Sequence, residues 1–210
     1  DPATIESPSL RPCCRLETAA VFDLKWAQHR HHRRDALALY VARSDGIISL
    51  WNVTTEQKKC ADGEAYTHEM KVLTDVDTGS PATFVEITGA DTSSSIVTCH
   101  SNGQCSLVSV SEDGSMAVTG SWKAHDFETW TAASAWKSGR PWMVWTGGDD
   151  CTLKGWDTRT ECSTSTFKCN KADIFSAGVT AIRFSEPGSP CGDCCVAVGS
   201  YDEGLSIWDS

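Results

Sequence analysis

One turn pattern recurs along the chain with a fixed spacing. An aspartate precedes a tryptophan by six residues at three places, and the pairs are Asp45 and Trp51, Asp150 and Trp156, and Asp202 and Trp208. A weaker copy, NGQCSLV, keeps the same spacing from Asn102 to Val108. Such recurrence indicates a repeat architecture in which each copy is one supersecondary unit that must stack on its neighbours.

Each copy reads as a series of short antiparallel strands. Ahead of the tryptophan position, mostly apolar residues alternate with Ser49, Ser106, Lys154 and Ser206, as a half-buried strand requires. A β-rich run precedes every turn, and Asp-Gly at 45–46 and Asn-Gly at 102–103 indicate hairpins. Further strands are expected at 21–26, 82–88, 129–136 and 178–184, with outer strands at 116–122 and 164–169.

These strands favour an all-β fold, a partial β-propeller of about four blades, each a four-stranded antiparallel sheet. The tryptophan positions are 57, 48 and 52 residues apart. Propeller repeats are usually about 40–45 residues, so the excess is expected in loops near 29–34, 60–80 and 186–194. We expect one domain over 1–210, with blades at about 15–60, 80–123, 124–170 and 177–210. A β-sandwich or a barrel is the alternative, but neither requires a fixed Asp-to-Trp spacing.

The turns resemble those of the WD-repeat family, because WNV, GWDT and IWDS stand where its Trp-Asp pair belongs. The resemblance implies that His125, Thr146, Asp150 and Trp156 form a hydrogen-bonded set that braces the third blade. It assigns the same bracing role to Asp45, Trp51, Asp202 and Trp208. A closed propeller of this family has roughly seven blades, so we expect the chain to be a fragment.

Charge and cysteine content exclude some classes of protein. The formal net charge is −10, and residues 61–210 carry twenty-one acids against nine Lys and Arg, which argues against a DNA-binding protein. No apolar run is long enough for a membrane span, and the first residues do not read as a signal peptide. The eleven cysteines are therefore expected as reduced thiols.

A closer resemblance covers residues 121–209. WKAHDFETWTAASAW, WTGGDDCTLKGWDTR and VAVGSYDEGLSIWD resemble the diphthine methylesterase family, and DLKW and SDGIISL extend the likeness weakly to the first unit. The resemblance implies a cytoplasmic enzyme without a cofactor. It would hydrolyse the methyl ester of methylated diphthine, a modified histidine on elongation factor 2. Elongation factor 2 and other diphthamide-pathway enzymes are the implied partners. The alternative is a non-catalytic WD-repeat scaffold.

Ester hydrolysis needs a base, a nucleophile and donors for the oxyanion. The serine motif G-x-S-x-G is absent, so we expect water activated by a histidine or a carboxylate. The candidate catalytic residues are His125, Asp149 and Glu203. His125 has bracing of the turn as its alternative role, and Glu203 stands where such a turn often has glycine.

Four further residues are candidates for substrate binding: Glu128, Trp130, Gly155 and Arg159. An aromatic face and a carboxylate attract the trimethylammonium group that the resemblance implies for the substrate. A glycine inside a strand can leave room for a ligand, and an arginine can hold a carboxylate. In an intact propeller we expect the largest polar pocket at the mouth of the central channel, lined by the loops at 125–130, 149–151 and 202–204.

Two clusters resemble metal sites without matching one. Cys191, Cys194 and Cys195 offer one ligand pair without a second at zinc spacing. The stretch from His29 to Arg34 reads as a basic loop, either a solvated insertion or a contact with RNA-bearing partners. We expect no metal at either place.

Overall fold

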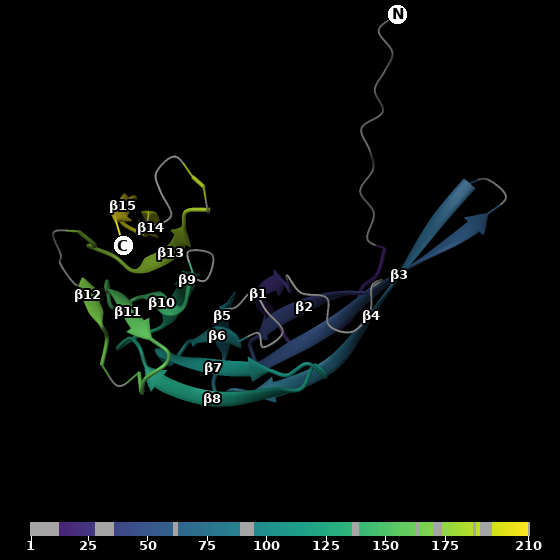
Figure 1. Ribbon diagram of the computed structural model, residues 1–210, viewed down its shortest axis with the longest axis horizontal. Helices are drawn as coiled ribbons and strands as arrows, with labels where there is room; N and C mark the ends of the chain where they lie inside the picture. Colours follow the sequence, from purple (N-terminus) through teal and green to yellow (C-terminus); the bar gives the residue numbers. More distant parts are fainter. Residues whose placement is uncertain are drawn as a thin grey trace, which may run out of the picture.

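The structure is a computed structural model, shown in Figure 1. It describes residues 13–27, 36–60, 63–88, 95–135, 139–162, 164–169, 174–186, 188–189 and 195–209.

The described residues form four antiparallel sheets in chain order, which follow one another along an arc (Figure 1). The first sheet holds β1 (Val21–Trp26), β2 (Ala36–Arg43), β3 (Ile47–Cys60) and β4 (Gly63–Asp77). The second holds β5 (Ala82–Ile87), β6 (Ser95–His100), β7 (Gln104–Val110) and β8 (Met116–Lys123). The third holds β9 (Thr129–Ala135), β10 (Arg140–Gly148), β11 (Leu153–Asp157) and β12 (Phe167–Cys169). The fourth holds β13 (Val179–Phe184), β14 (Cys195–Ser200) and β15 (Leu205–Asp209).

The first sheet differs from the sequence prediction, which placed a loop at 60–80 and ended the first blade at 60. β3 and β4 instead form a hairpin whose register runs from the Ile47–Asp77 pair to the Cys60–Gly63 pair. This hairpin continues well past the other strands of its sheet (Figure 1). The prediction was wrong because a strand with few buried side chains lacks the apolar alternation by which sequence patterns reveal strands.

The hydrophobic core lies between consecutive sheets. One cluster packs Ile48 and Leu50 of the first sheet against Val85 and Ile96 of the second. Two further clusters join the second sheet to the third and the third to the fourth. Each sheet between two others therefore buries both faces, and neighbouring sheets hold one another in place.

Candidate functional site

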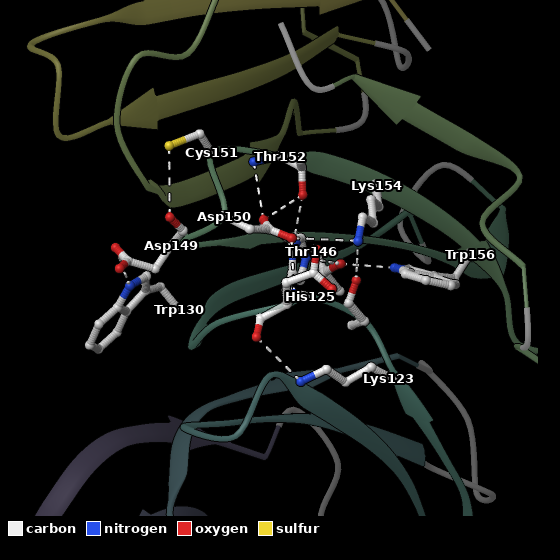
Figure 2. Close-up of polar contacts among 12 residues, drawn as sticks. Lys123, His125, Trp130, Thr146, Asp149, Asp150, Cys151, Thr152, Lys154 and Trp156 are labelled. Atoms are coloured by element: carbon white, nitrogen blue, oxygen red, sulfur yellow. Dashed lines mark hydrogen bonds and ion pairs between the residues drawn. The ribbon is translucent and has the colours of Figure 1, made fainter. Parts of the chain in front are cut away.

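A buried line of hydrogen bonds braces the turn between β10 and β11 (Figure 2). The indole N–H of Trp156 donates to Thr146 Oγ1 at 2.8 Å. Thr146 Oγ1 lies 2.8 Å from His125 Nε2, and His125 Nδ1 lies 2.8 Å from Asp150 Oδ1. The hydrogen bonds thus join the same four residues that the WD-repeat resemblance names for this blade.

The directions of these bonds and the burial of the ring fit a neutral imidazole. An indole N–H can only donate, so the Thr146 hydroxyl accepts from Trp156 and gives its own hydrogen to His125 Nε2. Nδ1 then carries the proton and donates it to Asp150. Burial, which disfavours the charged form, lowers the pKa of His125 below its ordinary value.

Asp150 is the charged end of this line. Burial acts to raise its pKa, but hydrogen bonds from His125, from Thr152 and from the backbone N–H of Asp126 outweigh it and hold the pKa well below the ordinary value. Lys154 Nζ lies 3.6 Å from Asp150 Oδ2 and adds a cation beside the carboxylate. Asp150 is therefore an anion whose oxygens are fully engaged in holding the turn.

His125 was predicted as a candidate catalytic residue, but its position in the structure favours a structural role. Its side chain has 0% exposure, and both ring nitrogens are already hydrogen-bonded. A substrate could reach neither nitrogen without breaking the line to Thr146 and Asp150. The geometry favours bracing over the role of general base.

Asp149 lies on the outside of the same turn and is exposed. The Trp130 indole Nε1–H donates to Asp149 Oδ1 at 3.4 Å, and Figure 2 shows this pair on the side of the turn away from Trp156. The backbone N–H of Asp149 donates to the carbonyl of Glu128 at 2.9 Å, which places Glu128 beside the pair. Three sequence candidates, Glu128, Trp130 and Asp149, therefore come together on one surface.

Glu203 lies on the corresponding turn of the fourth sheet. It is exposed and has a φ of +63°, in the left-handed region that favours glycine. The preceding Asp202 accepts hydrogen bonds from Ser200, from the backbone and hydroxyl of Ser176, and from the N–H of Gly204. These bonds, with that of Ser200 the strongest influence, lower the pKa of Asp202 to about 2.

The turns of the third and fourth sheets lie side by side. Burial first, and then the charges of Asp149, Asp150 and Asp202, raise the pKa of the Cys151 thiol. A Cβ added at Gly178 would meet Asp149 Oδ1 at 2.8 Å, and the carbonyl of Gly178 accepts a hydrogen bond from the backbone of Tyr201. The segment 176–178 thus connects the two turns. We call the exposed surface of these two turns, which carries Asp149 and Glu203, the rim.

Gly155 and Arg159 do not join this surface. Gly155 is buried, and a Cβ there would meet Phe167 Cβ at 3.3 Å, so the glycine makes room for a neighbouring side chain rather than a ligand. Arg159 follows the far end of β11, where it pairs with Asp157 at 2.6 Å and lies over the Trp142 ring at 4.3 Å. Both were expected at the substrate site, and the fold puts them elsewhere because β11 runs away from the turn.

The other turns are held by different partners. Asp45 accepts hydrogen bonds from Arg43 at 2.5 Å and from the backbone of Ile47, and Trp51 Nε1 has no hydrogen-bond partner among the described residues. In the fourth sheet the Trp208 indole donates to Ser206 at 2.7 Å. The Asp-to-Trp spacing therefore repeats from sheet to sheet, but the hydrogen bonds that hold each turn differ. Among the described residues, the set that joins Trp, Thr, His and Asp belongs to the third sheet.

A cavity of about 660 Å³ lies outside the predicted mouth. It is bordered by Leu107 and residues 119–123 on one side and by Thr158 and residues 160–162 on the other. This cavity does not include the loops at 125–130, 149–151 and 202–204, for which the pocket of an intact propeller stays a prediction.

Cys151 was missed by sequence reasoning although a signal existed. It stands where Gly46, Gly103 and Glu203 stand in the other turns, and all four have positive φ. Aligning the four turns on the residue after the aspartate or asparagine would have identified it.

Among the described residues, no cluster of histidine, cysteine and acidic side chains could hold a metal ion. Most of the two clusters noted in the sequence, Cys191–Cys195 and His29–Arg34, lies outside the described part of the chain. The described residues also contain no helix of the length and apolar character that a membrane crossing needs.

Solved structures share the architecture. A chain of polycomb repressive complex 2 from Chaetomium thermophilum matches with a TM-score of 0.67 and 12% identity, over 90% of this chain and 36% of that one. Sqt1 from Saccharomyces cerevisiae matches with a TM-score of 0.61 and 15% identity, over 82% of this chain and 44% of that one. Both are WD40 propeller proteins, so the predicted fold is confirmed: the chain forms four consecutive sheets of a WD40-type β-propeller.

No protein-family model matches the chain. It is nevertheless similar to two proteins named diphthine methyltransferase, at 30% identity to that of Mus musculus and 31% to that of Homo sapiens, over 93% of this chain. The resemblance to proteins that act on diphthine is thereby confirmed. The chain spans 39% and 41% of the length of these relatives.

Proposed function

We propose that the protein carrying this chain hydrolyses the methyl ester of methylated diphthine on the modified histidine of elongation factor 2. The observation that carries the proposal is the similarity, over 93% of the chain, to relatives whose names refer to diphthine. Elongation factor 2 would then be the protein substrate, encountered in the cytoplasm, with other diphthamide-pathway enzymes as further partners.

The exposed rim supplies groups for this chemistry. Asp149 and Glu203 are exposed carboxylates on adjacent turns, and either can accept a proton from water. The resulting hydroxide bonds to the ester carbonyl carbon, the tetrahedral intermediate collapses, and the methoxide leaves as methanol with a proton from the carboxylic acid. His125 takes no part in this step, because its ring is buried and both nitrogens are hydrogen-bonded.

The same rim suits a quaternary ammonium group. Trp130 is half-buried beside Asp149, and Glu128 lies next to that pair. An indole face attracts a cation through its quadrupole, and the Asp149 carboxylate beside the ring adds an attractive negative charge. The substrate's trimethylammonium would rest here and position the neighbouring ester.

Hydrolysis must be distinguished from methyl transfer, which the names of the relatives denote. Elongation factor 2 bearing methylated diphthine is incubated with the full-length protein, with and without S-adenosylmethionine. We expect the modified peptide to lose the mass of one methylene, independently of the methyl donor. A gain of the same mass that requires the donor would refute the hydrolytic proposal.

Removal of either rim carboxylate should lower turnover while the fold is kept. We expect Asp149→Asn or Glu203→Gln, whichever is the base, to reduce the rate by about 10²–10⁴-fold, since this is what general bases contribute. Glu112→Gln serves as a matched control, because Glu112 is an exposed acid in the hairpin between β7 and β8. Full activity of both rim variants, with unchanged circular dichroism, would exclude this rim as the catalytic site.

A non-catalytic scaffold is the second candidate function. The burial of His125 and the absence of a serine nucleophile motif favour it. Tight binding of elongation factor 2 without any mass change would decide for the scaffold.

A further inference from the structure

The cavity between the second and third sheets is lined by none of the residues proposed for catalysis. One wall is β8, which contributes Gly120, Trp122 and Lys123. The other wall is the segment after β11, which contributes Thr160, Glu161 and Cys162. In Figure 1 this segment comes down beside the end of β8.

The wall formed by β8 has an unused hydrogen-bonding edge. β8 is the last strand of its sheet, and no described strand pairs with its other side. Leu107 pairs with Gly120 whereas Val108 pairs with Val118, so β8 carries a bulge at Thr119. A bulge disrupts the ladder locally, so a further strand would add along Gly120–Lys123. An exposed edge with free N–H and C=O groups is a template for an extended peptide.

The cavity is open at the position where a peptide would approach. A Cβ added at Gly120 meets nothing within 4 Å. Trp122 is only 7% exposed, and its indole N–H has no hydrogen-bond partner among the described residues. Because the indole nitrogen is itself buried, the exposed part of the Trp122 side chain is what borders the cavity.

The charges on the two walls are not equally available. Lys123 Nζ already donates to the carbonyl of Asn102 at 2.7 Å and to that of Asp126 at 3.5 Å. Glu161 is exposed, with no hydrogen bond or ion pair recorded among the described residues. Lys123 keeps its charge, but its ammonium group is held by two backbone carbonyls, whereas the Glu161 carboxylate is available to pair directly with a cationic side chain of a ligand.

We propose that this cavity binds an extended segment of a partner protein that carries a lysine or arginine. The segment adds to the edge of β8 along Gly120–Lys123 and places its cation at Glu161. A bound peptide of about five residues is long enough to pair with the whole stretch Gly120–Lys123, since a strand rises roughly 3.3 Å per residue. The site is independent of the proposed esterase function, since it shares no residue with the rim of Asp149 and Glu203.

The proposal is tested with the 210-residue chain and two labelled pentapeptides, Ser-Val-Arg-Val-Ser and Ser-Val-Glu-Val-Ser, both blocked at their ends. We expect the arginine peptide to bind, by fluorescence anisotropy, and to slow amide hydrogen exchange in β8. The glutamate peptide should bind more weakly. No binding of the arginine peptide at about 1 mM, or equal binding of both peptides, overturns the proposal.

Two variants distinguish the contribution of the β8 edge to peptide binding from that of the Glu161 charge. Gly120→Val places a side chain at the cavity whose Cβ meets no atom within 4 Å, so we expect binding to be lost while the melting temperature is kept. Glu161→Gln should weaken the arginine peptide by roughly three- to fivefold, as for a partly solvated ion pair, and leave the glutamate peptide unchanged or stronger. Wild-type affinity in Gly120→Val overturns the proposal. Self-association through β8 that Gly120→Val abolishes, without peptide binding, would assign the edge to a second copy of the chain instead.

Discussion

At the scale of single residues, the four aspartate or asparagine turns share one backbone demand. The residue after the acid or amide has a positive φ in every case, at Gly46, Gly103, Cys151 and Glu203. Glycine adopts this conformation freely, whereas a residue with a Cβ is strained by about 1–2 kcal/mol. Cys151 and Glu203 therefore store strain on the rim that we propose for catalysis, where strained residues are often found.

This strain predicts that Glu203→Gly stabilises the fold. Relief of the strain outweighs the greater freedom of glycine in the unfolded chain, so the free energy of unfolding should rise by about 0.5–1 kcal/mol. Gly103→Ala should do the opposite, because its Cβ would lie 2.3 Å from the carbonyl oxygen of His125. Urea denaturation measures both. A loss of stability in Glu203→Gly would show that its backbone is not strained.

The buried histidine predicts a pH dependence of stability. The folded pKa of His125 is lowered by burial, so below about pH 6.5 the unfolded chain binds more protons than the folded chain. The contribution of His125 to the free energy of unfolding should therefore be greatest above that pH and should fall as the pH drops toward 5. His100, also buried with a lowered pKa, contributes in the same direction. Urea titrations of the wild type and His125→Asn should show a shallower decline in the variant.

At the scale of elements, glycines in the strands have opposite roles. Gly147 in β10 lies against β13, and a Cβ there would meet Val179 Cγ1 at 2.4 Å. Gly120 in β8 borders open space. Both were visible in the sequence, but only the packing of the sheets tells them apart.

We therefore expect Gly147→Ala to lower the free energy of unfolding by about 1–3 kcal/mol, the usual cost of overpacking. Gly120→Ala is the matched control, and it should be neutral or slightly stabilising because alanine reduces the freedom of the unfolded chain. Thermal melts of the two variants make the comparison. Equal melting temperatures would mean that the third and fourth sheets do not pack as described.

At the scale of the whole molecule, the two ends of the arc differ from its middle. Leu205 and Ile207 of β15 are 77% and 68% exposed, although their counterparts Ile48, Leu50 and Leu153 are fully buried. On the first sheet, Leu24 and Trp26 of β1 are also half exposed. The same pattern therefore has different environments, because burial depends on whether another sheet covers that face.

This difference predicts unequal costs for similar truncations. Leu153→Ala should destabilise the chain by about 2–5 kcal/mol, because it leaves a cavity in the core between the third and fourth sheets. Ile207→Ala should cost less than about 1 kcal/mol, because its side chain is largely solvated already. Chemical denaturation of both variants in the same buffer provides the measurement. A cost at Ile207 equal to that at Leu153 would mean that β15 is covered in solution.

Much of the fold follows from local patterns. Strand alternation and the fixed Asp-to-Trp spacing are short-range features, and they predicted most strands. The hydrogen bonds from Trp156 to Asp150 were implied by the resemblance to the WD-repeat family. The β3–β4 hairpin was not predicted, because a strand with few buried residues has little apolar alternation. The candidate site was only partly predictable, since Gly155 and Arg159 are close in sequence to the turn but lie along a strand that leads away from it.

The sequence by itself determined the repeating unit, because each turn and strand is specified by residues within reach of one another along the chain. Only the tertiary structure decided which repeats share a rim, which faces are covered and where the cavity lies. These properties depend on contacts between sheets distant in sequence. The adjacency of Asp149 and Asp202 through the segment 176–178, and of β8 and Glu161 across the cavity, is of this kind.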